Sequence, residues 1–186
     1  MNLSKIFKNT LLVLTACLVL SACATKKEVA IQEEPPKKEE PKKEEKKEEV
    51  TKIEKIAGQM QGDVYVGTES VKYLADGVPD RVFFATNESI LTTASRETLR
   101  AQAAWLRQNP SVTVVVEGHA DERGTREYNL ALGERRANAA KDYLMTYGVS
   151  SDRITVLSYG KERPVDSGSN PLAWSKNRRS VTVKAN

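Results

Sequence analysis

The fold is decided by the stretch EGHADERGTREYNLALGERRA, residues 117–137, in which a strand ends and a long helix begins. Residues 112–117 are mostly β-branched and apolar, which predicts a buried strand. Residues 118–125 are polar and include two glycines, which predicts a turn. Apolar residues then recur at helical spacing from about Arg126 to Tyr147, and Gly148 suits the position that follows a helix.

The sequence on either side of this stretch predicts further strands and helices. Residues 82–84 are a short strand candidate, and Thr92 or Thr93 can cap a helix that ends at Gln108. Further predicted elements are strands over 154–158 and 180–184 and a short helix over 171–176. The predicted order is β-α-β-α-β-α-β. Strands that alternate with helices indicate an α/β domain of about 120 residues.

The first 23 residues resemble a secretory signal that ends in a lipid-attachment site. Two lysines precede an apolar run over residues 10–20, which is too short to span a bilayer. A buried core helix is the alternative, but the basic flank at the N-terminus favours a signal. Leu20-Ser21-Ala22-Cys23 resembles the lipobox of bacterial lipoproteins. That resemblance implies cleavage after Ala22, acyl chains such as palmitate on Cys23 and, because Ala24 follows, the outer membrane.

Residues 23–57 are predicted to be the lipidated cysteine and a disordered tether. Three prolines lie among lysines and glutamates, and such a composition buries too little surface to offset the entropy of ordering. The Lys-Lys-Glu-Glu repeat also places like charges at i,i+4, which disfavours a helix. A partly helical stretch after Pro41 stays the alternative. Residues 58–78 are then a lead-in segment, and residues 79–186 the domain.

The composition excludes several classes of site. Cys17 and Cys23 are the two cysteines, so no disulfide or thiolate metal site is possible in the domain. A formal charge of +4 is too small to indicate nucleic-acid binding. His119, the single histidine, lies beside Asp121 and Glu122, but partner ligands for a metal are absent from the pattern. No nucleophile motif points to catalysis, so no enzyme, cofactor or metal is expected.

Residues 117–137 closely resemble the signature of the OmpA-like domain family, in its branch of lipoproteins that associate with peptidoglycan. The match continues in residues 158–164 and 174–179, so that it covers roughly residues 80–186. It implies a small mixed β-sheet of about four strands with helices packed on one face. It also implies non-covalent binding of the diaminopimelate end of the peptidoglycan stem peptide, which anchors the outer membrane to the cell wall.

The resemblance implies partners as well. Family members bind TolB of the Tol system through a surface that overlaps the wall-binding side, which connects them to envelope integrity and cell division. A wall anchor and a protein-interaction module acting mainly through TolB therefore stay alternatives. In either case the domain is expected in the periplasm and the lipid in the outer membrane.

Within this resemblance the ligand pair falls on Asp121 and Arg136. A carboxylate at Asp121 suits the ammonium of diaminopimelate, and the planar fork of Arg136 suits its carboxylate. Phe84, Thr125 and Asn129 complete the predicted site. Without the resemblance, residue type alone would make Asp121 a cap or turn residue and Arg136 a residue of a solvated helix face. Neither side chain is expected on the apolar face of its element, so both are expected to be replaceable without unfolding.

Two positions depart from the family pattern. The first strand of the family usually reads aromatic-Phe-Asp-x-Asp, whereas residues 83–87 read Phe-Phe-Ala-Thr-Asn. Ala85 and Asn87 thus replace two acids, and a ligand hydrogen bond through a carboxylate at position 85 is lost or supplied by backbone. Further on, Asn177 and one of the two following arginines are expected to tie the last strand to the ligand-side loops.

Overall fold

Four strands form the central sheet of the computed structural model, which describes residues 58–185. The predicted signal, Cys23 and tether lie outside these residues. The elements are β1 (Met60–Gln61), β2 (Val64–Tyr65), β3 (Tyr73–Ala75), β4 (Val78–Pro79), β5 (Arg81–Phe83), α2 (Thr93–Gln108), β6 (Val114–His119), α3 (Arg126–Thr146), the 3-10 turn η1 (Ser151–Arg153), β7 (Ile154–Gly160), α4 (Pro171–Asn177) and β8 (Arg179–Lys184). From β5 onward the predicted order of strands and helices is confirmed.

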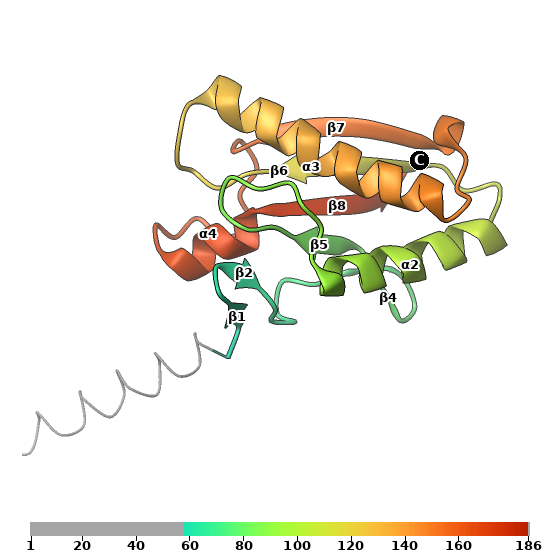
Figure 1. Cartoon of the computed structure of the whole chain (residues 1–186), viewed down its shortest axis with the longest axis horizontal. Coiled ribbons are helices and arrows are strands. Elements are labelled where there is room, and N and C mark those ends of the chain that lie inside the picture. Colours follow the sequence, from blue (N-terminus) through green and yellow to red (C-terminus); the bar gives the residue numbers. More distant parts are fainter. Residues whose placement is uncertain (1–57, 186) are drawn as a thin grey trace, which may run out of the picture. The chain divides into compact units, whose positions relative to one another are not determined.

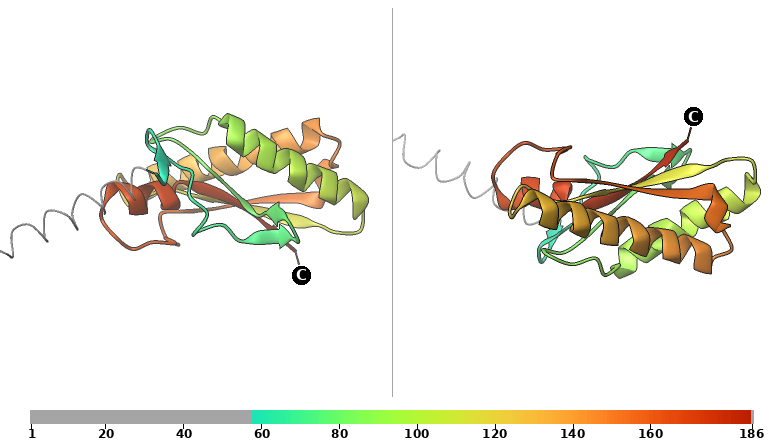
Figure 2. Two further views of the ribbon diagram at one scale, coloured as in Figure 1. Left: turned by 90° about the horizontal axis from the view of Figure 1, so that it is seen from below. Right: turned by 90° about the horizontal axis from the view of Figure 1, so that it is seen from above.

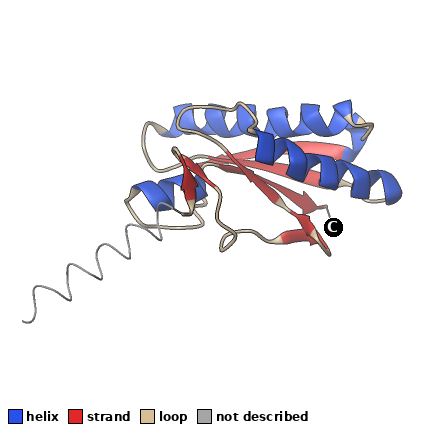
Figure 3. Cartoon of the chain, turned by 60° about the horizontal axis from the view of Figure 1, so that its bottom comes forward, coloured by secondary structure: helices blue, strands red, loops and turns tan. Residues whose placement is uncertain are grey.

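The sheet has the order β5-β8-β6-β7 and is mixed. Strand β8 pairs antiparallel with both β5 and β6, and β6 pairs parallel with β7. Helices α2 and α3 lie side by side on one face of this sheet (Figures 2 and 3). The predicted fold class, a small mixed sheet with helices on one face, is therefore confirmed.

The two long helices begin at threonine caps. The Thr92 hydroxyl accepts a hydrogen bond from the backbone N–H of Ser95 at 3.1 Å, which decides between the two predicted caps of α2. At the start of α3, the Thr125 hydroxyl accepts from the N–H of Tyr128 at 3.2 Å. Such a cap contributes about 0.5–2 kcal/mol. Because Thr125 caps α3, Asp121 is not needed for that role.

The core lies between the sheet and these helices. Leu99 and Leu106 of α2 and Leu144 of α3 pack with Val114 and Val116 of β6. Two glycines then bring α3 close to the end of β6, since a Cβ on Gly118 would lie 1.8 Å from the Gly133 carbonyl oxygen. This close approach positions the next turn of α3 beneath the loops at that end of the sheet.

Several strand and helix ends lie close together at one end of the sheet, which is called its edge here. Strands β5, β6 and β7 run in the same direction and end there, and β8 begins there. The start of α3 and helix α4 lie at this same edge, on the left of Figure 1. Residues that follow three strands and precede a fourth are thereby brought together, although they are far apart in the sequence.

The lead-in segment before the expected boundary at residue 79 is also folded. That boundary falls inside β4, and two short hairpins, β1–β2 and β3–β4, precede β5. Tyr65 of β2 is buried, and its ring meets that of Phe83 edge-on at 4.8 Å. Strands of two or three residues have no readable periodicity, so the sequence pattern did not reveal them.

Candidate functional site

Asp121 lies two residues after the end of β6, at the edge of the sheet where the strand ends lie together. This part of the molecule is named the Asp121 edge. Its carboxylate accepts hydrogen bonds from Arg123, at 2.7 Å for Nη2, 3.2 Å for Nε and 3.1 Å for the backbone N–H. Arg178, between α4 and β8, donates from Nη1 at 3.2 Å. The residue is 7% exposed, so this carboxylate is a nearly buried anion between two arginines.

These partners keep Asp121 ionised. Burial alone would raise the pKa of the carboxyl group, because it penalises the charged form. Hydrogen bonds from the Arg123 side chain and backbone and from Arg178 outweigh that effect, and the pKa lies below its usual value. An anion held in this way suits a cationic ligand group.

Arg136 is placed differently from the prediction. The residue has 0% exposure, and its guanidinium donates to three backbone carbonyls, those of Glu88 (2.8 Å), His119 (2.8 Å) and Ala85 (3.0 Å). Burial, followed by the charge of Arg178, lowers its pKa to about 10, so the side chain remains a cation at neutral pH. The prediction that Arg136 lies off the apolar face of α3 was wrong, and so was its interpretation as part of a solvated face from residue type alone. Leu132, Arg136, Ala140 and Leu144 share the buried side of α3.

The other predicted ligand residues support this edge from within. Phe84 is fully buried in the core, with the Arg136 guanidinium 5.3 Å from its ring centroid, so its ring is not exposed to a ligand. Thr125 is exposed and caps α3. Asn129 is buried and donates from Nδ2 to the Arg123 carbonyl at 2.8 Å. The structure thus brings the five predicted residues to one end of the sheet, where Thr125 is exposed and the other four are buried.

The two departures from the family pattern form a turn over Arg136. The N–H of Glu88 donates to the Ala85 carbonyl at 3.2 Å, and Asn87 has a φ of 58°. Asparagine adopts this left-handed conformation more readily than most residues. At position 85 the backbone carbonyl, rather than a side chain, meets the arginine.

Side chains from elsewhere in the domain hold the Asp121 loop through its backbone carbonyls. Lys161, which follows β7, donates from Nζ to the carbonyls of Glu122 (3.2 Å) and Gly124 (2.7 Å). Asn129 holds the carbonyl between them. Gly124 has a φ of 90°, a conformation that L side chains rarely adopt. The backbone of residues 122–124 is therefore fixed independently of the contacts that their side chains make.

Three residues of this site, Arg123, Trp174 and Arg178, were not predicted as ligand residues. Arg123 has its guanidinium 4.4 Å from the Trp174 ring centroid, and the Trp174 indole donates to Glu122 Oε1 at 2.8 Å. Arg178 is buried and also donates from Nε to the Phe84 carbonyl at 3.1 Å. The residue types alone carry no signal for these contacts, because α4 and β8 are about 50 residues away in the sequence.

Asn177 and one of the following arginines, Arg179, tie β8 to the neighbouring loops, as predicted. The Asn177 side chain accepts from the N–H groups of Val165 (2.8 Å) and Asp166 (3.1 Å). Arg179 is buried and donates to the Arg163 carbonyl at 3.1 Å. Arg178 and Arg179 are both buried, so neither forms an exposed basic patch.

His119 is a buried neutral side chain. Its Nε2 lies 3.4 Å from Glu117 Oε2, and no partner for Nδ1 is found among the described residues. Burial, together with the charges of Arg179, Arg81 and Arg163, lowers its pKa to about 3. Within residues 58–185 no group of three His, Cys, Asp or Glu side chains is placed to hold a metal ion.

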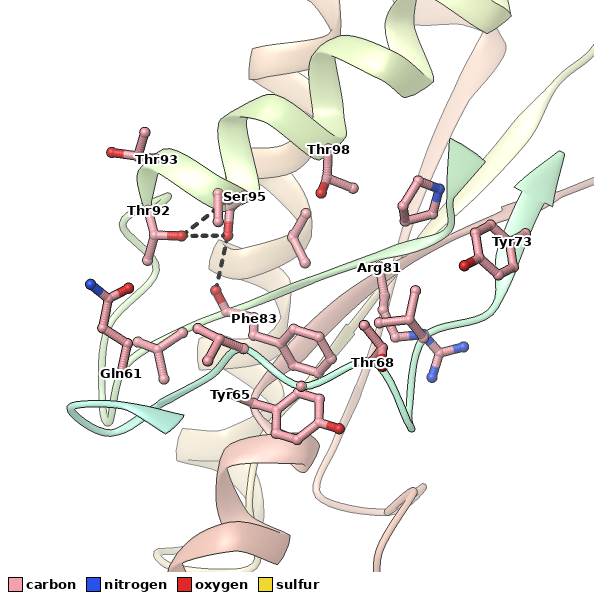
Figure 4. A pocket seen from close by; sticks show the side chains of 17 residues that line it. Gln61, Tyr65, Thr68, Tyr73, Arg81, Phe83, Thr92, Thr93, Ser95 and Thr98 are labelled. Atoms are coloured by element: carbon pink, nitrogen blue, oxygen red, sulfur yellow. Dashed lines mark hydrogen bonds between the residues drawn. The ribbon is translucent and has the colours of Figure 1, made fainter. Parts of the chain in front are cut away.

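A groove of about 620 Å³ lies elsewhere on the molecule, along β5 (Figure 4). It is lined by β5, the start of α2 and residues of the lead-in such as Tyr65 and Val71. The Ser95 hydroxyl donates to the Phe83 carbonyl at 3.1 Å in its wall. None of the predicted ligand residues lines this groove, so it is separate from the Asp121 edge.

Comparison with known proteins identifies the family. A model described as the OmpA family matches residues 83–178. The chain belongs to the OmpA family. The resemblance inferred from residues 117–137 is thereby confirmed, and so is the prediction that the chain is not an enzyme. The family match covers the ends of β5, β6 and β7, the Asp121 loop and Arg178, which together form the candidate site.

Two similar proteins share the name peptidoglycan-associated lipoprotein. The peptidoglycan-associated lipoprotein of Mesorhizobium japonicum is 55% identical over 106 residues, which are 57% of this chain and 63% of that protein. The chain thus spans less than two thirds of this relative. The protein of the same name from Pasteurella multocida is 41% identical over 131 residues, 70% of this chain and 83% of that one.

A solved structure agrees with the sequence relatives. The crystal structure of the peptidoglycan-associated lipoprotein from Burkholderia pseudomallei matches with a TM-score of 0.56 and 35% identity, over 57% of this chain and 90% of that chain.

Within residues 58–185, no helix combines the length and hydrophobicity that crossing a bilayer requires.

Proposed function

We propose that this protein is an outer-membrane lipoprotein whose periplasmic domain binds peptidoglycan without covalent chemistry. Residues 1–22 are its signal and Cys23 its lipid anchor, followed by a tether up to residue 57. The domain binds the diaminopimelate end of the stem peptide at the Asp121 edge. It thereby connects the outer membrane with the wall as part of the Tol–Pal system, with TolB as a protein partner.

The observation that carries the proposal is the Asp121 carboxylate in a chain whose relatives are named peptidoglycan-associated lipoproteins. Diaminopimelate ends in an ammonium and a carboxylate, and an ionised carboxylate at a strand end is a suitable partner for the ammonium. The two arginines beside Asp121, Arg123 and Arg178, supply positive charge for the carboxylate of the ligand. Arg136 contributes by holding the loop after β5 and the end of β6 in place.

A sedimentation assay with isolated peptidoglycan sacculi tests the binding. The full chain is expected to sediment with sacculi, and Asp121→Ala is expected to bind about tenfold to a hundredfold more weakly, since the ligand ammonium loses its partner. Asp142→Ala, on the exposed side of α3, is the matched control and should bind like the parent. Equal sedimentation of the parent and Asp121→Ala would place the binding site elsewhere.

Mass spectrometry of the protein purified from membranes tests the anchor. The mature chain is expected to begin at Cys23 and to carry acyl chains, because several chains are needed for stable membrane attachment. Cys23→Ser should leave an uncleaved precursor or a soluble periplasmic form. An unmodified N-terminus at another residue would refute this part of the proposal.

A further inference from the structure

Among residues 58–185, two arginines contact the Asp121 carboxylate, and they differ in exposure. The Arg178 side chain is 3% exposed, whereas that of Arg123 is 42% exposed. The Asp121 side chain itself is 8% exposed. Arg123 therefore lies on the solvent side of this carboxylate, and Arg178 lies on its buried side.

Arg178 cannot be displaced in the same way. Besides Asp121 it binds the carbonyl of Phe84 through Nε at 3.1 Å and the carbonyl of Asp63 through Nη2. These contacts join the start of β8 to the end of β5 and to the lead-in hairpin. Moving Arg178 would leave the carbonyl of the buried residue Phe84 without this donor, which is costly.

Arg123 is bound more loosely through its side chain. Beyond Asp121, its guanidinium has the Trp174 ring at 4.4 Å and a long hydrogen bond of 3.4 Å to the Thr86 hydroxyl. The backbone of Arg123 stays fixed by Asn129 and by the flanking contacts of Lys161. The side chain is thus free to change partner without any movement of the loop.

Asp121 remains a competent anion after such a change. It keeps the hydrogen bonds from the Arg123 backbone N–H at 3.1 Å and from Arg178 at 3.2 Å. The position vacated by the Arg123 guanidinium is then a site for one ammonium group. The guanidinium itself, close by and without a partner, is a fork that matches a carboxylate.

Arg136 does not offer an equivalent fork in this arrangement. It has 0% exposure, and all three of its nitrogens donate to backbone carbonyls. A ligand carboxylate would have to open the turn over residues 85–88 to reach it. Arg123 needs only a side-chain rotation.

We propose that Arg123 is the exchangeable counter-ion of Asp121 and the residue that selects a zwitterionic ligand end. The ligand ammonium replaces the Arg123 guanidinium at Asp121, and the released guanidinium binds the ligand carboxylate. One internal ion pair becomes two pairs with the ligand, so no charge is left alone. A ligand that carries the ammonium alone leaves Arg123 unpaired and is disfavoured. This inference rests on the proposed function, since it concerns the same edge.

Calorimetric titration of the full mature chain in detergent with two matched peptides tests the exchange. One is a stem peptide with diaminopimelate, and the other has lysine in its place, which keeps the ammonium and lacks the carboxylate. The parent is expected to prefer the diaminopimelate peptide by about tenfold or more, the effect of one charge-assisted pair. Arg123→Ala should lose that preference, while it binds the lysine peptide as well as the parent or more tightly.

Two further variants complete the test. Arg126→Ala removes an exposed arginine that is paired with Glu162, close in the chain but away from Asp121, and should keep the parent's preference. Arg123→Lys keeps the charge without the fork and should show an intermediate preference. Circular dichroism establishes that each variant is folded.

The outcomes separate the two proposals. If the parent prefers the diaminopimelate peptide and Arg123→Ala retains that preference, the exchange is wrong and the proposed function stands. An equal loss of both peptides in Arg123→Ala would show a merely structural role and also overturns the exchange. A parent that binds neither peptide nor sacculi overturns the proposed function, and the exchange with it.

Discussion

Arg136 and Arg123 lie in neighbouring regions of the same sheet edge, and the two regions use an arginine in opposite ways. Under the loop after β5, Arg136 is fully buried and donates to three carbonyl groups. In the loop after β6, Arg123 is exposed, contacts a tryptophan ring and pairs with one carboxylate. The comparison teaches that the partners of a guanidinium, rather than its charge, decide whether it maintains the fold or can meet a ligand.

The largest expected difference between these regions is in stability. Arg136→Ala should lower the free energy of unfolding by about 3–5 kcal/mol, because removal of a buried hydrogen-bonded cation leaves carbonyl groups without donors. Arg136→Lys should cost nearly as much, since one ammonium cannot reach three carbonyls in the geometry of a fork. Urea denaturation measures both values.

Arg135, the next residue along α3, provides the control for this prediction. It is exposed, and Arg135→Ala should change stability by about 0.5 kcal/mol or less. A stability of Arg136→Ala equal to that of Arg135→Ala would mean that the three carbonyl contacts do not hold in solution. The burial of Arg136 would then no longer separate it from Arg123.

The second expected effect is a pH dependence on the buried side of the edge. The pKa of His119 is lowered to about 3 from 6.5, so the unfolded chain binds a proton that the folded chain refuses. Stability should therefore fall as the pH drops from about 6.5 towards 3, by up to about 1.4 kcal/mol per pH unit for this one group. Denaturation at several pH values should show a smaller slope for His119→Gln. Parallel slopes for the parent and this variant would contradict the prediction.

The smallest effect is expected at Arg123. Arg123→Ala should lower the free energy of unfolding by about 1 kcal/mol or less, because a partly exposed ion pair contributes little and Asp121 keeps its other donors. Thermal or urea unfolding measures this change. A loss as large as that of Arg136→Ala would remove the distinction between the two regions, and Arg123 would become a structural residue.

The elements of the domain were largely predictable because their signals are local. Helix α3 runs from Arg126 to Thr146, close to the predicted span, since its apolar spacing and its capping threonine lie within the segment itself. The hairpins before β5 were missed for the opposite reason. Their strands are too short for a period, and contacts such as that of Tyr65 with Phe83 stabilise them.

The sequence by itself determined the order of strands and helices, the family, and the positions of Asp121 and Arg136 in its signature. Only the tertiary structure decided which arginine is buried and which is exposed, because burial depends on segments remote in the chain. The carbonyls of Ala85 and Glu88 come from the loop after β5, and Trp174 comes from α4. A residue's type specifies what it can bind, whereas the packing of the sheet edge specifies what it does bind.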